Sequence, residues 1–204
     1  MHVVVMDAGY VCGVLCGAGY VLQGRNYVIG LETGDKEFAE LFAGELASCV
    51  GKTPSVNVKQ REKPVYVVTL YGKRQIEAFV NMWKLKTNMG GVPEATHKDH
   101  EFRIGFLSGF FDAKASVIAQ QRNIVLPIWD RYISAVSTDK ALLENIMALL
   151  AEAQIDSSLF RHGAKLWSIR IGGETRMKSF AKNAGFRRAV KSARLERAIL
   201  PEGV

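Results

Sequence analysis

The sequence predicts an α+β protein with two pseudo-symmetric αββαββα repeats, and three observations lead to this prediction. A helical segment rich in small residues occurs twice, at 11–19 and 107–115, and the two copies are 96 positions apart. Each copy is followed by strand-like and helix-like patterns in the same order. Turn residues separate these patterns at matching places, and such self-similarity indicates an internally duplicated fold.

The two repeated helices should pack directly against each other. Small residues recur in them at steps of four, which is about one helical turn, so each set lines one face of its helix. A helix face without side chains lets another backbone approach closely. The residues expected at this helix–helix interface are Gly9, Gly13 and Gly17 in the first copy and Gly105, Gly109 and Ala113 in the second.

After its motif helix, the first repeat should contain four strands and two helices. Alternating apolar residues between turns predict the strands at 20–22, 26–31, 55–61 and 65–71. Thr33-Gly34-Asp35 should open an amphipathic helix, because apolar residues recur at helical spacing after it. A second helix is expected at 75–83.

The second repeat should follow the same order. Its strands are expected at 116–121, 129–136, 157–161 and 166–171. Ser137-Thr138-Asp139 should cap the helix between the two strand pairs, and a closing helix is expected at 177–184. The expected divisions of the chain are a first repeat at 1–85, a linker at 86–100, a second repeat at 101–186 and a basic C-terminal tail at 187–204.

The charge of the chain indicates an anionic partner, most simply nucleic acid. The net charge is +7 and the pI is near 9.4. The positive charge gathers at the C-terminal end, where eight basic residues stand against two acids, Glu196 and Glu202. The basic residues are Arg176, Lys178, Lys182, Arg187, Arg188, Lys191, Arg194 and Arg197.

The cysteines and the N-terminal apolar segment indicate a protein of a reducing, intracellular compartment. Cys12, Cys16 and Cys49 form no disulfide framework, and four closely spaced ligands for a zinc site are absent from the sequence. Residues 3–22 are long enough to span a bilayer, but they include Asp7 and four glycines and lack a basic n-region. We therefore expect a buried helix here, a cytoplasmic protein and no membrane partner.

The two motifs resemble the paired motif of the LAGLIDADG homing endonucleases and maturases. The matching segments are Val11-Cys12-Gly13-Val14-Leu15-Cys16-Gly17-Ala18-Gly19 and Leu107-Ser108-Gly109-Phe110-Phe111-Asp112-Ala113-Lys114-Ala115. Residues 134–160 are also similar to what such proteins show after their second motif, so the resemblance covers nearly the whole chain. It implies a homing endonuclease-like fold with the motif helices at the interface between the repeats. It also implies two saddle-shaped antiparallel sheets astride a duplex.

The resemblance further implies a metal site whose ligands are missing here. In the family, the eighth motif position carries an acid that holds a divalent metal at the cleaved phosphate, and these positions are Ala18 and Lys114 in this chain. Metal-assisted hydrolysis needs carboxylates, whereas a methyl group cannot ligate Mg²⁺ and an ammonium repels it. Asp112 should point away from Lys114, and Asp7 lies three turns before Ala18. We therefore expect no catalytic residue, no metal and no cofactor, with Mg²⁺ required only if the chain is catalytic after all.

Alternation along the strands predicts a nucleic-acid-binding face on each sheet. With helices on one face, Val56 and Val58 should enter the core while Asn57, Lys59 and Arg61 take the open face. Polar and basic side chains on such a face can reach phosphates and base edges, although they can also serve only to keep strand edges soluble. Lys59, Arg61, Arg131, Arg161 and Arg170 are expected to point away from the helices. The candidate binding residues are Gln23, Arg25, Asn57, Lys59, Arg61, Lys114, Gln121, Arg122, Arg131, Arg161, Lys165, Ser168, Arg170, Arg187, Arg188, Lys191 and Arg194.

Three functions remain open at this level. The first is a nuclease-inactive LAGLIDADG-fold protein that binds nucleic acid, with a slight preference for structured RNA, such as an intron or ribosomal RNA, over duplex DNA. The second is a site-specific DNA homing endonuclease, active through other residues or inactivated by design. The third is a protein-interaction module. The unequal replacements at Ala18 and Lys114 favour natural loss of the acids over deliberate removal, and one chain with both repeats favours a monomer.

Overall fold

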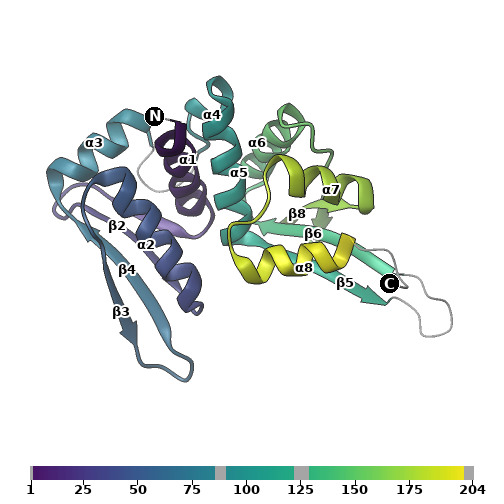
Figure 1. The fold of residues 1–204 in the computed structure, drawn as a ribbon, viewed down its shortest axis with the longest axis horizontal. Helices are drawn as coiled ribbons and strands as arrows, with labels where there is room; N and C mark the ends of the chain where they lie inside the picture. Colours follow the sequence, from purple (N-terminus) through teal and green to yellow (C-terminus); the bar gives the residue numbers. More distant parts are fainter. Residues whose placement is uncertain (1, 86–90, 122–128, 200–204) are drawn as a thin grey trace. The chain divides into compact units, whose positions relative to one another are not determined.

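Figure 1 shows the computed structural model of the chain, in which residues 2–85, 91–121 and 129–199 are described. The chain divides into two compact units, residues 1–113 and 114–204, and each is described by itself. The division falls at the end of the second motif helix, so both motif helices belong to the first unit.

The first unit contains one four-stranded sheet and five helices in its described part. Its helices are α1 (His2–Gly17), α2 (Lys36–Val50), α3 (Lys73–Trp83), α4 (Ala95–Lys98) and α5 (His100–Lys114), whose last residue crosses the division. Its strands are β1 (Gly19–Leu22), β2 (Val28–Thr33), β3 (Ser55–Lys59) and β4 (Val65–Tyr71). The strands are antiparallel in the order β1-β2-β4-β3.

The second unit repeats this plan. Its strands are β5 (Ala115–Gln121), β6 (Trp129–Ser137), β7 (Ser158–His162) and β8 (Leu166–Gly172), and its helices are α6 (Lys140–Glu152), α7 (Glu174–Asn183) and α8 (Ala189–Ile199). The strands are antiparallel in the order β5-β6-β8-β7, which matches the first sheet strand for strand. The two αββαββα repeats predicted from the sequence are therefore confirmed.

Glycines bring α1 and α5 into backbone contact, as the four-residue spacing predicted. A Cβ atom placed on Gly13 would lie 2.0 Å from the carbonyl oxygen of Phe106, and one placed on Gly109 would lie 2.1 Å from that of Tyr10. Real Cβ atoms do not approach so closely, so only glycine fits at these two positions. Gly9 and Gly105 make the corresponding contacts with Phe102 and Met6. The same helix pair is joined by a buried hydrogen bond of 2.9 Å, which the Tyr10 hydroxyl donates to Asp112 Oδ2.

Matching side chains cap the central helix of each repeat. Asp35 accepts a hydrogen bond of 3.0 Å from the amide of Phe38 at the start of α2, and Asp139 accepts one of 2.9 Å from Leu142 at the start of α6. Each capping aspartate satisfies an amide that has no partner within its helix. The same capping chemistry therefore starts the central helix of both repeats, at the residues that the sequence predicted.

One face of each sheet is covered by helices and forms the core of its unit. In the first unit, α2 packs on β2 and β4, and the rows Ile29, Leu31 and Val68, Leu70 are almost wholly buried. In the second unit, α6 and α7 pack on β8, and α8 packs on β5 and β6. Ile133, Ala135, Ile169 and Ile171 form the corresponding buried rows.

The β3 strand corrects one expectation about the core. Val56 and Val58 lie on the helix side of the sheet but remain 40% and 48% exposed, because β3 is an edge strand and all of its residues are exposed. The strand also ends at Lys59, so Arg61 lies in the bend that follows it and not in the sheet.

The basic C-terminal segment is not an open tail over its described part. Residues 189–199 form α8, whose Leu195 and Ala198 are buried, and α8 packs beside α7 (Figure 1).

Near the N-terminus, Cys12 and Cys16 are buried in α1, and burial raises the pKa of the Cys12 thiol. None of the described helices is long and apolar enough to cross a membrane.

Candidate nucleic-acid interface

The face of each sheet opposite the core carries most of the polar and aromatic strand side chains that reach the surface. Alternation along a strand sends successive residues to opposite faces, so the buried isoleucines and leucines identify which residues lie on the open face. In the first sheet this face includes Tyr20, Glu32, Asn57, Lys59 and Tyr71. In the second sheet it includes Gln120, Tyr132, Phe160, His162 and Arg170.

On the first sheet, the predicted binding residues Asn57 and Lys59 are exposed on the open face. Lys59 Nζ donates a hydrogen bond of 2.6 Å to Glu32 Oε1, and this bond lowers the pKa of the Glu32 carboxyl. The ring of Tyr20 covers Gly30, where an added Cβ would lie 2.3 Å from the ring. The cation at Lys59 is thus held beside a carboxylate, an arrangement that the sequence analysis did not foresee.

The candidate binding residues near the turns lie outside the strands or outside the described residues. Arg25, Arg61 and Lys165 are exposed in turns outside the strands, and Gln23 is half-buried directly after β1. Arg122 and the side chain of Gln121 lie outside the described residues.

On the second sheet, Arg131 and Arg161 correct the prediction that they point away from the helices. Arg131 alternates with the buried Ile133 and Ala135, so it lies on the helix side of β6. Arg161 pairs with Trp167 on that same side, its guanidinium lies 5.6 Å from the Trp167 ring centroid, and its Nε donates to the Gly163 carbonyl. Trp167 alternates with the buried Ile169 and Ile171, so its partner Arg161 also lies on the helix side.

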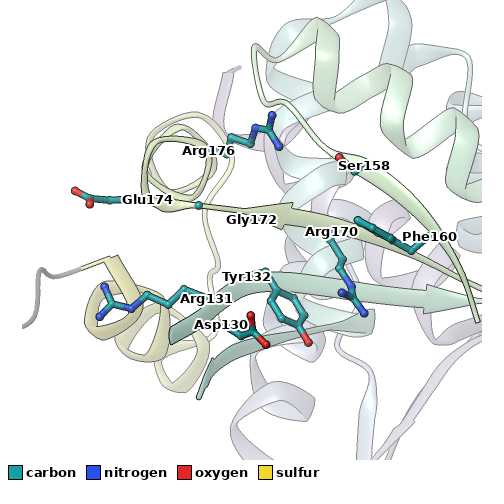
Figure 2. A pocket seen from close by; sticks show the side chains of 10 residues that line it. Asp130, Arg131, Tyr132, Ser158, Phe160, Arg170, Gly172, Glu174 and Arg176 are labelled. Atoms are coloured by element: carbon teal, nitrogen blue, oxygen red, sulfur yellow. The ribbon is translucent and has the colours of Figure 1, made fainter. Parts of the chain in front are cut away.

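Ser168 and Arg170 do lie on the predicted open face of β8. Ser168 is wholly buried, however, and its hydroxyl is 2.8 Å from His162 Nε2, so it supports the face and does not reach its surface. Arg170 lies between two aromatic rings, with its guanidinium carbon 4.7 Å from the centroid of Tyr132 and 4.8 Å from that of Phe160 (Figure 2). We call Tyr132, Phe160 and Arg170 the Arg170 clamp.

The Arg170 clamp borders a surface cavity of about 670 Å³ at the end of the second sheet, which open-face residues line together with the first turn of α7. Figure 2 shows that the side chains of Arg131 and Glu174 point away from Arg170, whereas Tyr132 and Phe160 flank it. The lining residues come from the ends of β6, β7 and β8 and from the first turn of α7: Asp130, Arg131, Tyr132, Ser158, Phe160, Arg170, Gly172, Gly173, Glu174 and Arg176.

The basic residues after Gly185 lie on the helix side of the second unit. Lys191 is half-buried, its ammonium donates a 2.5 Å hydrogen bond to the Ala115 carbonyl, and it lies 5.6 Å from the Phe186 ring centroid. This lysine therefore attaches α8 to β5, a contact that the sequence analysis did not predict. Arg187 and Arg188 are half-buried before α8, and Arg194 is exposed on α8.

The ends of the motif helices do not supply ligands that fit a divalent metal. Ala18 follows α1 directly and Lys114 ends α5, and both are exposed. A methyl group has no lone pair for a metal, and an ammonium repels it. Asp112 is wholly buried and accepts the Tyr10 hydrogen bond. Within the described parts of the chain, no three His, Cys, Asp or Glu side chains come together in a group that could hold a metal ion.

Two repeats of this order, with the glycine-rich helices α1 and α5 in contact and one open face on each sheet, have the fold of the two-repeat homing endonucleases. Residues 101–185 match the model of the LAGLIDADG-like domain. The resemblance seen in the sequence is therefore confirmed, and the chain contains a LAGLIDADG-like domain within a two-repeat homing endonuclease fold.

Two relatives and two solved structures support this assignment. The chain is 29% identical to the uncharacterized protein MJ0314 of Methanocaldococcus jannaschii over 74% of its own length, but it spans only 56% of that protein. It is 23% identical to the homing endonuclease I-ApeI of Aeropyrum pernix, over 91% of this chain and 84% of that one. The fold matches I-DmoI in complex with DNA and calcium, with a TM-score of 0.65, 15% identity and coverage of 95% of this chain and 98% of that one. It also matches full-length DUF199/WhiA from Thermatoga maritima, with a TM-score of 0.64, 14% identity and coverage of 98% and 63%.

Proposed function

We propose that this chain binds nucleic acid through its open sheet faces and does not cleave it. The observation that carries the proposal is the absence of an acid at both motif ends, where Ala18 and Lys114 stand in a fold shared with homing endonucleases. The net charge of +7 and the exposed Asn57 and Lys59 on one open face suit a polyanion.

We also propose a slight preference for structured RNA over duplex DNA. A protein that finds a DNA target without cutting it must act there as a regulator. A protein that binds RNA can act by stabilising the folded structure of that RNA. On this proposal the chain is a cytoplasmic monomer that requires no cofactor, because one chain carries both repeats and neither motif end offers a metal ligand.

A cleavage assay tests the first half of the proposal. The full chain is incubated with a library of duplex DNA targets and with structured RNAs in Mg²⁺ or Mn²⁺, and the products are sequenced. No specific product is expected, because hydrolysis through metal ions needs carboxylates at the reacting phosphate. A specific double-strand cut would overturn the proposal.

A binding assay tests the second half. Fluorescence anisotropy with labelled duplex DNA and with a folded RNA of similar length should give a log affinity that falls linearly with log salt, by about 0.7–0.9 for each neutralised phosphate. The lack of binding to either probe at low salt would point instead to a protein partner.

The alternative is a site-specific DNA endonuclease, and a specific observation favours it. The relative from Aeropyrum pernix is named a homing endonuclease, and it aligns over most of this chain. Under this alternative Mg²⁺ would be the cofactor. The double variant Ala18→Asp with Lys114→Asp distinguishes the two functions. If the variant cuts DNA and the native chain does not, the native chain has lost the activity, whereas cutting by the native chain supports the endonuclease. The matched control Ala18→Asn with Lys114→Asn removes the Lys114 ammonium without adding carboxylates.

A further inference from the structure

We propose that the cavity beside the Arg170 clamp accepts one unstacked nucleobase, so that the second sheet recognises an unpaired or looped-out nucleotide and not a continuous duplex. The inference rests on the proposed function, because it names the form of nucleic acid that this surface takes. It concerns only the second unit, in which all of the lining residues lie.

The clamp is preformed by three neighbouring strands. Tyr132 on β6, Arg170 on β8 and Phe160 on β7 share the open face, and the guanidinium lies 4.7 and 4.8 Å from the two ring centroids (Figure 2). A guanidinium over an aromatic face is attracted by the negative charge of the ring face. The Nε atom of Arg170 is buried and has no hydrogen-bond partner among the described residues, so ring contacts and not hydrogen bonds hold this side chain.

The surface around the clamp is suited to stacking. Phe160 is 43% exposed, and Val136 and Leu166 on the same face are 43% and 39% exposed. Aromatic rings and guanidinium planes are the groups on which unstacked bases of single-stranded nucleic acids are held. The cavity volume of about 670 Å³ also falls in the range of small-ligand sites, which is about 300–1,000 Å³.

The part of the face next to the clamp is suited to stacking more than to reading a base edge in a duplex. Reading base pairs in the major groove requires donors and acceptors that reach into it. Next to the clamp, Ser168 is wholly buried and bonded to His162, and the exposed Val136 and Phe160 offer neither donor nor acceptor. The exposed groups beside the clamp therefore offer apolar and aromatic surface to a base.

The charged groups that line the cavity suit a whole nucleotide. Three arginines line it together with Asp130 and Glu174, so the lining carries both signs of charge. The arginines can contact the phosphate of a nucleotide, and a carboxylate can accept a hydrogen bond from the exocyclic amine of a base. Figure 2 shows the Asp130 side chain beside the Tyr132 ring, next to the clamp on which the base would stack.

The experiment compares two RNA hairpins that differ only in one bulged nucleotide, which carries 5-iodouridine for photocrosslinking. Affinities are measured by anisotropy for the native chain, for Phe160→Leu and for Met82→Leu as a control at an exposed apolar residue of α3. The native chain should bind the bulged hairpin more tightly, and Phe160→Leu should lose about tenfold on that hairpin alone, since stacking on an aromatic ring is worth roughly that much per base. Met82→Leu should bind both hairpins as the native chain does.

Crosslinking provides a second readout that does not depend on affinity. Mass spectrometry should place the crosslink within 130–132, 158–160 or 170–176. Equal affinity of the native chain for both hairpins, or equal losses of Phe160→Leu on both, overturns the inference while leaving the proposed function intact. If neither hairpin nor any duplex binds, the proposed function fails and the inference fails with it. Circular dichroism checks that Phe160→Leu folds, as its half-exposed position leads us to expect.

Discussion

In the first sheet, Thr69 occupies the position that corresponds to Arg170 in the second, and Val28 and Asn57 occupy those of Tyr132 and Phe160. The correspondence follows from strand register, because Gly30, Thr69 and Ser55 form one row of the first sheet, as Ser134, Arg170 and Ser158 do in the second. The capping residues Asp35 and Asp139 stand at the same offset from β2 and β6, which gives the same alignment.

The difference extends to the charged groups. The first sheet holds the Lys59–Glu32 ion pair where the second holds His162 and Val136. The backbone plan, the helix caps and the strand order are shared between the repeats, whereas the open-face side chains are not. This comparison teaches that the two repeats share the residues that determine the fold and differ in those of the open faces, so under the proposed function the two sheets should differ in how they bind nucleic acid.

The largest effect is expected where the repeats are most alike. Gly13→Leu and Gly109→Leu should each destabilise the chain by about 1–3 kcal/mol or more, because each new side chain meets a backbone carbonyl that now lies 2.0 or 2.1 Å from the Cβ position. Thermal denaturation followed by circular dichroism measures the loss. Gly44→Ala is the control, since in the described chain nothing beyond its own helix backbone and chain neighbours lies within 4 Å of the added Cβ, and it should stabilise α2 slightly. An unchanged melting temperature for Gly13→Leu would contradict the paired-helix contact.

A smaller effect should separate the two open faces. Arg170→Glu should weaken nucleic-acid binding by about 1–3 kcal/mol, whereas Lys59→Glu should mainly reduce the salt slope by about 1 if Lys59 contacts a phosphate. The difference is expected because Arg170 belongs to a preformed clamp, while Lys59 is an exposed point charge already paired with Glu32. Affinities at several salt concentrations give both quantities, and identical salt-dependent losses would erase the proposed difference between the sheets.

The helix caps should again behave alike. Asp35→Ala and Asp139→Ala should each cost about 0.5–2 kcal/mol of stability, because each leaves an amide at the start of its helix without its acceptor. Urea denaturation measures both, and Asp→Asn at the same positions should retain most of the stability. A large effect in one repeat only would show that the second cap is replaced by another group.

The smallest effect concerns pH and only the first sheet. The Lys59 hydrogen bond lowers the pKa of Glu32, so this pair stabilises the folded chain above the ordinary Glu pKa of about 4.3. The contribution is lost as the pH falls through the lowered pKa, because the protonated carboxyl no longer attracts the ammonium. The pair is exposed, so well under about 1 kcal/mol is at stake. Glu32→Gln should narrow the difference in melting temperature between pH 7 and pH 3, and Val136→Gln at the equivalent position should not.

Local patterns predicted most of the fold. Turn residues and apolar periodicity gave the element order, Asp35 and Asp139 gave two helix starts, and the glycine spacing gave the contact between α1 and α5. These features depend on residues close in sequence or on a repeating interval. The burial of β3 was predicted less well. Burial of Val56 and Val58 depends on how far the helices extend over an edge strand, which the sequence does not show.

The candidate site was predicted only in part, for a physical reason. Arg170 was identified on the open face, but Tyr132 and Phe160 were not, because their contact with Arg170 depends on the register of three strands far apart in sequence. The sequence could have shown which residues of β6 share a face. Ile133 and Ala135 are apolar, so alternation places Arg131 on their face and Tyr132 on the opposite, open face. The attachment of Lys191 to the Ala115 carbonyl carried no such signal, because it joins segments 76 residues apart.

The helix pair also governs the order in which this protein can form. The hydrogen bond between Tyr10 and Asp112 joins residues 102 positions apart, and both motif helices belong to the first compact unit. That unit therefore stays incomplete during synthesis until α5 has left the ribosome, although its sheet and α2 are made much earlier. Contacts between residues so distant in sequence require closure of a long loop, which slows folding and leaves apolar surface exposed meanwhile. We expect the contact between α1 and α5 to be the last to form in the first unit, although α1 is the first helix to be made and its contacts with β1 and α2 can form earlier.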